Sequence, residues 1–159
     1  MKILVLSDSH KSVDRCYAAM LREQPGVVIH LGDHIDDARA LKRELPGTRF
    51  EMVAGNCDYG TPTDYEKVIE LEGVRILVTH GHLYDVKNGL NKLIRRGADL
   101  RVNLALYGHT HNAWLEYTRG FWLMNPGQME RDCDSRPAGY GIVTIADGKA
   151  EAELRKLNF

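Results

Sequence analysis

Side chains that bind metal ions recur along the chain in short clusters, and each cluster follows a run of aliphatic residues. They are two aspartates, one asparagine and four histidines: Asp8, His10, Asp33, Asn56, His80, His109 and His111. Carboxylate, amide and imidazole groups without a thiolate suit borderline to hard divalent ions such as Mn, Fe, Zn, Co or Mg. Seven ligands are too many for one tetrahedral ion, so they favour two ions that share a carboxylate and leave positions for water and substrate.

A pair of divalent ions suits one kind of chemistry in particular. Two ions about 3.5–4 Å apart polarise phosphoryl oxygens and lower the pKa of a bound water until it is a hydroxide nucleophile near neutral pH. The residue types therefore predict a hydrolase that acts on a phosphate ester.

The aliphatic runs predict the strands that position these ligands. The chain opens strand–helix–strand–helix–strand, which is typical of an α/β sheet with parallel neighbours. Ligands bind beyond the carboxyl ends of such strands, so clusters at five strand ends can converge on one crevice. We expect strands at 2–6, 27–31, 50–54, 67–71, 75–79, 104–107, 113–117, 121–124, 140–146 and 150–154, the last two joined by a tight turn at Asp147-Gly148.

Apolar residues at helical spacing predict three helices between the strands. The first carries Val13, Cys16, Tyr17, Met20 and Leu21 on one face and ends near Pro25-Gly26; the second carries Ile35, Ala38, Leu41 and Leu45 and ends at Pro46-Gly47. The third carries Val86, Leu90, Leu93 and Ile94 and is expected to stop at Gly97.

Length and composition describe an ordinary globular protein. With 159 residues, 43% hydrophobic and 27% charged, the chain is expected to form one domain over residues 1–159. The net charge of -1 gives no general attraction to nucleic acid or anionic lipid. The three cysteines form no Cys-x-x-Cys pair, and no apolar run has the length of a signal peptide or membrane span, so a reducing cytoplasm is expected.

The ordered motifs resemble a known family. They are Asp8-Ser9-His10, Gly32-Asp33, Gly55-Asn56-Cys57-Asp58, His80-Gly81-His82 and Gly108-His109-Thr110-His111. This order is similar to that of calcineurin-like metallophosphoesterases. The small size and the segment Leu123-Met124-Asn125-Pro126-Gly127 further resemble the compact bacterial and archaeal phosphodiesterases related to the retromer subunit of the same fold. The resemblance implies a two-sheet β-sandwich flanked by helices, in four αββα layers, with the metals at one edge.

The resemblance also implies how the ligands divide between the ions. One ion would be held by Asp8, His10, Asp33 and His111, and the other by Asp33, Asn56, His80 and His109, with Asp33 bridging. A metal-bridging hydroxide would attack phosphorus in line while Asn56 helps to place the phosphate, which gives Asn56 and His109 catalytic as well as metal-binding roles. Manganese is the expected metal, with Fe, Zn, Co, Ni or Mg as alternatives.

One position departs from the pattern of many relatives. They carry Gly-Asn-His-Asp, in which the histidine protonates the leaving oxygen or binds phosphate and the aspartate orients it. This chain has Cys57 in place of that histidine, followed by Asp58, so the resemblance makes Cys57 and Asp58 candidate catalytic residues. A thiol is a poor substitute for an imidazolium as a proton donor near pH 7. A diester with a good leaving group needs that proton less, so we expect a preference for phosphodiesters, with His82 or the substrate itself as another proton source.

Two other function classes stay open. One is a catalytically weak interaction scaffold of the same fold, as in the retromer relative, although this chain keeps the full ligand set. A phosphomonoesterase is another alternative, whereas a protein phosphatase or nuclease is less favoured because the chain lacks the length for a peptide groove or a DNA-binding arm. We expect a small phosphodiester substrate, no stable binding to nucleic acid or membrane, and, by family analogy only, a homodimer.

The remaining polar and aromatic residues have simpler expected roles. His30 is expected to pack near the site, and His34 and His82 to lie beside the ligands. Asp36 and Asp37 are expected to favour a helix N-terminus through its dipole. Among the rest, Cys16 is expected in the core, Cys133 exposed, and Trp114, Phe121 and Trp122 in the core or at a subunit contact; the loop 128–138 is the candidate for mobility.

Overall fold

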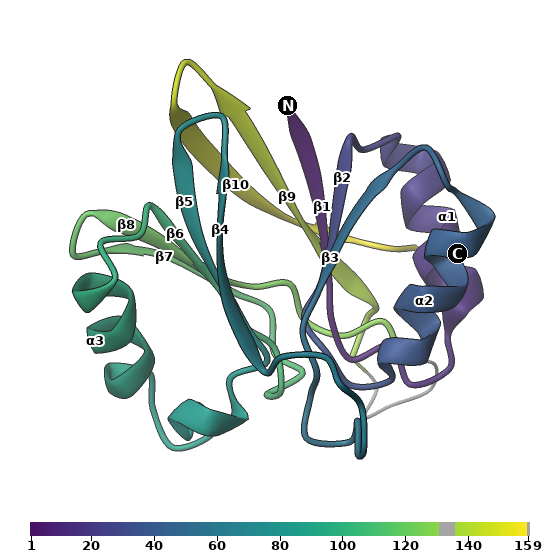
Figure 1. Cartoon of the computed structure of the whole chain (residues 1–159), viewed down its shortest axis with the longest axis horizontal. Coiled ribbons are helices and arrows are strands. Elements are labelled where there is room, and N and C mark those ends of the chain that lie inside the picture. The colour runs from purple at the N-terminus through teal and green to yellow at the C-terminus, as the bar shows by residue number, and fades with distance from the viewer. Residues whose placement is uncertain (131–135, 159) are drawn as a thin grey trace.

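Within the part of the chain that the structure describes, ten strands form two mixed sheets of five strands each (Figure 1). The computed structural model describes residues 1–130 and 136–158. The first sheet has the order β10 (Lys149–Lys156), β9 (Gly139–Ala146), β1 (Lys2–Leu6), β2 (Val27–His30) and β3 (Arg49–Met52). The second has the order β4 (Glu66–Leu71), β5 (Val74–Thr79), β6 (Leu104–Leu106), β8 (Phe121–Asn125) and β7 (Trp114–Thr118).

Alternating side chains divide the apolar residues between the layers. In β1, Ile3 and Val5 face the second sheet, whereas Leu4 and Leu6 face the helices, because successive side chains of a strand point to opposite faces. Burial on both faces explains why the sequence shows unbroken aliphatic runs here instead of an alternating pattern. The parallel pairing of β1 with β2 and of β2 with β3 confirms the predicted α/β opening.

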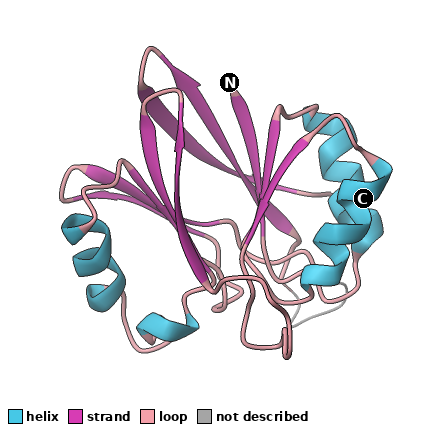
Figure 2. Cartoon of the chain, in the orientation of Figure 1, coloured by secondary structure: helices cyan, strands magenta, loops and turns pink. Residues whose placement is uncertain are grey.

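Helices cover the outer face of each sheet, which completes the four αββα layers (Figure 2). Helices α1 (Val13–Glu23) and α2 (Ile35–Glu44) lie on the first sheet, and α3 (Asn91–Asp99) lies on the second, preceded by the 3₁₀ turn η1 (His82–Tyr84). Cys16 lies in the core as predicted, but Tyr17 and Leu21 are exposed. The buried face of α1 runs through Cys16, Ala19, Met20 and Glu23, and Tyr17 and Leu21 lie outside it.

The third helix differs from its predicted extent. Val86 precedes the helix, and Gly97 lies inside it instead of ending it. A Cβ added at Gly97 would lie 2.8 Å from the ring of Phe121. This glycine therefore allows the helix to pack closely on β8, and it does not serve as a terminator.

The late segments follow the prediction with one exception. Strands β9 and β10 pair across Asp147-Gly148, where both residues have a positive φ, as a two-residue type I′ turn requires. Phe121 is buried as expected, whereas Trp114 is 50% exposed and lies outside the core, so of its two predicted places only a subunit contact stays a prediction. Cys133 and the central part of the loop 128–138 lie outside the described residues. No helix within the described ranges is long and apolar enough to span a membrane.

Candidate metal centre

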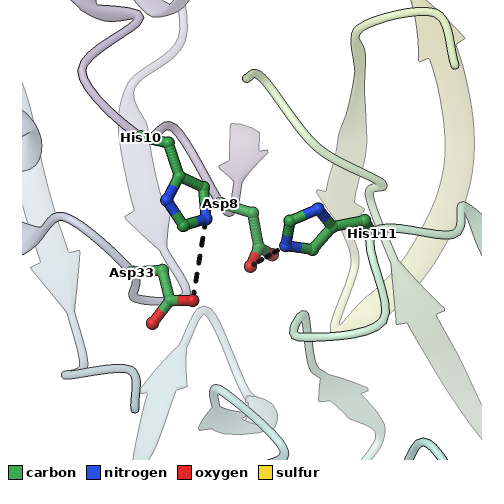
Figure 3. Close-up of side chains that lie close together, drawn as sticks. All are labelled: Asp8, His10, Asp33 and His111. Carbon is green, nitrogen blue, oxygen red and sulfur yellow. Dashed lines mark ion pairs between the residues drawn. The ribbon is translucent and has the colours of Figure 1, made fainter. Parts of the chain in front are cut away.

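The seven predicted ligands meet where strands of both sheets end. Asp8 follows β1, Asp33 follows β2, and His80 follows β5, as the sequence indicates. Nε2 of His111 lies 3.1 Å from Asp8 Oδ1, and Nε2 of His10 lies 3.7 Å from Asp33 Oδ2 (Figure 3). One ligand atom from each of Asp8, His10, Asp33 and His111 can be chosen so that all four lie within 4.8 Å of one another, as a metal site requires.

The three other ligands, Asn56, His80 and His109, lie next to this cluster, and His80 is close to both of the others. Its Nε2 lies 3.5 Å from Asp33 Oδ2 and 3.0 Å from Asn56 Oδ1. The ring of His109 lies 5.1 Å from that of His80, measured between centroids, and the backbone N–H of His109 donates to Asp8 Oδ2 at 3.2 Å. Asp33 is thus near ligands of both predicted groups, in the position expected of a shared carboxylate.

The turns that carry the ligands have unusual backbone conformations. Positive φ angles occur at Asp8, His10, Asp33, His109 and His111, between 40° and 69°. Residues other than glycine uncommonly adopt this region, in which aspartate, asparagine and histidine are the more frequent, and backbone of this kind gathers at functional sites. The sharp turns aim several side chains from one strand end into the same crevice.

Two glycines let these turns approach one another. A Cβ at Gly55 would lie 2.2 Å from Asp33 Oδ1 and 2.4 Å from the Asp33 backbone nitrogen. A Cβ at Gly108 would lie 2.0 Å from Ser7 Oγ and 2.8 Å from Asp8 Oδ2. Any side chain at either position would push a ligand carboxylate out of place.

Both ligand aspartates are buried and ionised. Burial opposes the charge of Asp8, but its contacts with His111, His80 and Ser7 outweigh burial and lower its pKa. Asp33 is likewise desolvated, yet His80 and the backbone N–H of Cys57, which donates to Oδ1 at 2.9 Å, hold its pKa well below the ordinary value. The centre therefore offers two carboxylates to a cation at neutral pH.

Hydrogen bonding orients His80 as a metal ligand. Nδ1 lies 2.8 Å from the backbone oxygen of Leu31, to which only a protonated nitrogen can donate. In the neutral ring Nε2 then carries a lone pair, and it faces the oxygens of Asn56 and Asp33. Lone pairs that converge in this way repel one another unless a cation lies between them or the ring is protonated. Burial opposes protonation of His80, but Asp33 and Asp8 outweigh burial and raise the pKa of the ring, which favours protonation when no cation is bound.

A further buried atom fits the same interpretation. Nε2 of His10 is buried and makes no hydrogen bond within the described chain. An unsatisfied buried nitrogen costs free energy unless a partner is supplied. A divalent ion coordinated by His10 and Asp33 would supply one, so the residues present fit the metal that the sequence predicts.

Of the two candidate catalytic residues that follow Asn56, Asp58 is buried and Cys57 is exposed. Both carboxylate oxygens of Asp58 accept backbone N–H groups, Oδ1 from Ile35 and Oδ2 from Gly55, each at 2.8 Å. Asp58 therefore ties the start of α2 to the turn that carries Asn56, and its predicted catalytic role would act through that turn. The side chain of Cys57 is exposed, and its thiol replaces no ligand in the cluster.

A buried series of hydrogen bonds connects His30, Ser9 and Asp37 behind the ligand-bearing turns. The Gly32 N–H donates to Nδ1 of His30 at 3.2 Å, so the neutral ring is protonated at Nε2 and donates to Ser9 Oγ at 3.1 Å. Ser9 in turn donates to Asp37 Oδ2 at 2.7 Å. Burial lowers the pKa of His30 to about 4, which keeps the ring neutral.

These hydrogen bonds confirm the packing role predicted for His30. Asp37 lies in the first turn of α2 as predicted, and the hydrogen bonds give it a second role. Asp37 is not simply a charge at the helix terminus, because its carboxylate is buried and also accepts the backbone N–H of Lys11 at 2.8 Å. Asp36 remains exposed in the first turn and pairs with Arg39. His34 and His82 lie beside the ligands as expected, with ring centroids 4.8 Å from His10 and 5.5 Å from His80.

Two supporting residues were not predicted from the sequence. Ser7 is fully buried and its hydroxyl donates to Asp8 Oδ2 at 2.5 Å. The buried Asn125 amide donates to the Gly108 oxygen and to Thr110 Oγ1, both at 3.0 Å, and accepts the Gly127 N–H. A polar residue at the last position of an aliphatic strand was the available signal for Asn125, which shapes the turn that carries His109 and His111.

Comparison with known proteins agrees with the geometry. Residues 1–148 match the family model of the calcineurin-like phosphoesterase superfamily domain. The probable metallophosphoesterase YsnB of Bacillus subtilis is 31% identical over 94% of this chain and 88% of its own length. Phosphodiesterase YfcE of Escherichia coli is 29% identical over 57% of this chain and 50% of its own length.

Similarity also extends to solved structures. Vps29 of Entamoeba histolytica, crystallised as a complex with Zn²⁺, superposes with a TM-score of 0.78 over 99% of this chain and 100% of its own, at 20% identity. That identity shows the fold alone. The match over residues 1–148, the relative YsnB and the cluster of possible metal ligands agree with this fold. The chain belongs to the calcineurin-like phosphoesterase superfamily, a family of metal-dependent hydrolases.

Proposed function

We propose that this chain hydrolyses phosphodiesters with a pair of divalent metal ions. The observation that carries the proposal is the convergence of seven potential ligands, two of them buried carboxylates, from five separate strand ends. A structural ion needs about four ligands, so the surplus and the shared position of Asp33 favour two ions. Manganese is the ion we expect among those that nitrogen and oxygen ligands without thiolate suit, with Fe, Zn, Co, Ni or Mg as alternatives.

The residues divide between the ions as the motifs imply. Asp8, His10, Asp33 and His111 would hold one ion, and Asp33, Asn56, His80 and His109 the other. When bound, the ions supply charge neutralisation for the phosphoryl oxygens and a water of lowered pKa. The protein contributes position: the backbone N–H of Cys57 and the Ser7 hydroxyl fix the two carboxylates, and the Leu31 oxygen fixes the His80 ring.

The diester preference depends on Cys57. An imidazolium at this position could donate a proton to a poor leaving group, and the exposed thiol cannot do so efficiently near pH 7. Diesters with good leaving groups depend less on that proton. The name of the relative YfcE, a phosphodiesterase, supports the same substrate class.

The central test is hydrolysis of bis(p-nitrophenyl) phosphate with and without added Mn²⁺. We expect metal-dependent turnover that His111→Ala removes, with Asp36→Ala as a control, since the Asp36 side chain is exposed and pairs with Arg39. Equilibrium titration should give two ions per chain. Absence of metal-dependent turnover in the intact protein would favour the interaction scaffold.

Cys57→His tests the substrate class separately. This variant should raise the turnover of a monoester with a poor leaving group, such as glycerol 2-phosphate, relative to the turnover of bis(p-nitrophenyl) phosphate, because it restores a proton donor for the leaving oxygen. An unchanged ratio would refute this explanation of the diester preference.

A further inference from the structure

A pocket opens beside the metal centre, on the side where His109 and His111 lie. These two residues belong both to the predicted ligand set and to the wall of the pocket. Its volume is about 560 Å³, within the range of about 300–1,000 Å³ that holds small molecules. A phosphate seated on the ions would therefore place one of its ester arms at the mouth of this pocket.

An aromatic side chain forms part of the wall. Trp114, at the start of β7, lines the pocket and is 50% exposed. Its indole N–H donates to Glu116 Oε2 at 3.2 Å, a neighbour two residues along the same face of the strand, which restrains the ring. Apolar side chains of Val86 and Leu90 line the same space. A flat ring can stack on an exposed indole of this kind.

The charge of the wall is positive. Lys87 and Arg136 both line the pocket, and none of its lining residues within the described ranges is acidic. Arg136 is anchored by a hydrogen bond from Nη1 to the backbone oxygen of Thr110 at 3.3 Å, next to the ligand His111. Two cations among the described lining residues favour an anion beyond the phosphate that the ions would hold.

A second pocket near His111 lacks the aromatic wall. Its volume is about 320 Å³, and apart from His111 its described lining contains no aromatic residue. It is also lined by cations, among them Arg136, which the two pockets share, so charge does not separate the two pockets. The first pocket is the better place for an aromatic arm because Trp114 lines it.

We propose that this pocket binds a nucleotide arm of the substrate, with the base against Trp114 and an additional phosphate near Lys87 and Arg136. The inference rests on the proposed phosphodiesterase function, which it deepens by naming the substrate class. Trp114, Lys87 and Arg136 then determine specificity, whereas the ligands hold the reacting phosphate.

The first experiment measures binding instead of turnover. A Trp122→Phe variant leaves Trp114 as the one tryptophan, so its fluorescence reports on the pocket. With Mn²⁺ present, adenosine 5′-monophosphate should quench this fluorescence and bind about tenfold more tightly than ribose 5-phosphate. Equal affinities for the two compounds would overturn the stacking role of Trp114.

Matched variants separate the contributions of the ring and the cations. Trp114→Ala should weaken adenosine 5′-monophosphate about tenfold and leave ribose 5-phosphate within about twofold, whereas Trp114→Phe should keep most of the affinity. Tyr117→Ala, at an exposed aromatic outside the pocket, should change neither. A similar loss for both compounds in Trp114→Ala, or in Tyr117→Ala, would contradict the proposal.

The experiment on the two cations, Lys87 and Arg136, uses adenosine 3′,5′-bisphosphate. It should bind more tightly than the monophosphate, and Lys87→Glu should remove that gain, while Lys42→Glu on the exposed face of α2 should preserve it. No gain in the parent protein would overturn the role of Lys87 and Arg136.

The outcomes distinguish the two proposals. Quenching that depends on the base, without any diester turnover, would sink the proposed function and leave the pocket assignment standing. Diester turnover without preference for a base or a second phosphate would do the reverse.

Discussion

Buried carboxylates occur in two regions of the molecule, and their charges are balanced in different ways. Glu23, at the end of α1, accepts two hydrogen bonds from Arg155 Nη1, at 2.8 and 2.7 Å, and one from the Tyr140 hydroxyl at 2.8 Å. Lys2 lies 3.5 Å away. Asp8 and Asp33 have no lysine or arginine nitrogen within 4.0 Å among the described residues; their ion-pair partners there are imidazoles.

The difference separates a structural ion pair from a site prepared for an added cation. At Glu23 the protein supplies the positive charge itself. Burial opposes the charge of Glu23, but the hydrogen bonds from Tyr140 and Arg155 outweigh burial and lower its pKa. At the candidate metal centre the partners are histidines, which bind metal as neutral ligands and can leave the positive charge to the ion. Two carboxylates so close together then become a reason to bind a divalent ion.

The largest expected effect tests the shared carboxylate. Asp33→Asn should lower metal-dependent turnover by more than about 100-fold, because even changes in groups that support metal ligands cost 10–100-fold. Steady-state kinetics and metal titration by calorimetry would measure it. Glu23→Gln, at the other buried carboxylate, should keep both metal binding and turnover; a comparable loss there would remove the distinction between the regions.

Added metal should stabilise the protein through the carboxylates of the candidate metal centre and not through Glu23. At about 100 times its Kd, each bound Mn²⁺ should raise the free energy of unfolding by about 2.7 kcal/mol through mass action. Asp8→Asn should remove the gain from the ion that Asp8 would hold, whereas Glu23→Gln should retain the full gain. Urea unfolding with and without a chelator would show the difference, and a metal gain that is undiminished in Asp8→Asn would argue against this centre.

The glycine beside Asp33 tests how closely the turns must pack. Gly55→Ala should lower the free energy of unfolding by about 1–3 kcal/mol, because its Cβ would overlap the Asp33 backbone and carboxylate. Gly47→Ala is the matched control, since a Cβ added at Gly47 would meet no atom within 4 Å. Thermal and urea unfolding measure both, and equal effects would contradict the packing argument.

The smallest expected effect is the pH dependence at Glu23. Its folded-state pKa is lowered, so its contribution to stability is present above the unfolded-state pKa of about 4.3 and is lost as pH falls through the folded-state value. Glu23→Gln should therefore cost about 1 kcal/mol at pH 7 and less in acid. Urea unfolding between pH 7 and pH 3 measures this, and parallel curves for the two proteins would exclude the effect.

Much of the fold was predictable because burial leaves a periodic record. Strands buried on both faces require continuous aliphatic runs, so 2–6, 27–31 and 75–79 were apparent from composition alone. Gly97 shows the limit of this reasoning. A glycine near the end of a periodic segment predicts a helix end, but here it makes room for the ring of Phe121, which lies 24 residues further along the chain.

By itself the sequence determined the class of chemistry and the residues available for it. Local order placed Asp8, Asp33, Asn56, His80, His109 and His111 just after aliphatic runs, and ligand preferences follow from side-chain type. The tertiary structure decided which of these groups share contacts, that Asp37 and Asp58 support the turns, and that Trp114, Lys87 and Arg136 face one pocket. Such relations depend on how two sheets pack and how sharply each turn bends, and residues distant in sequence carry no local signal of that geometry.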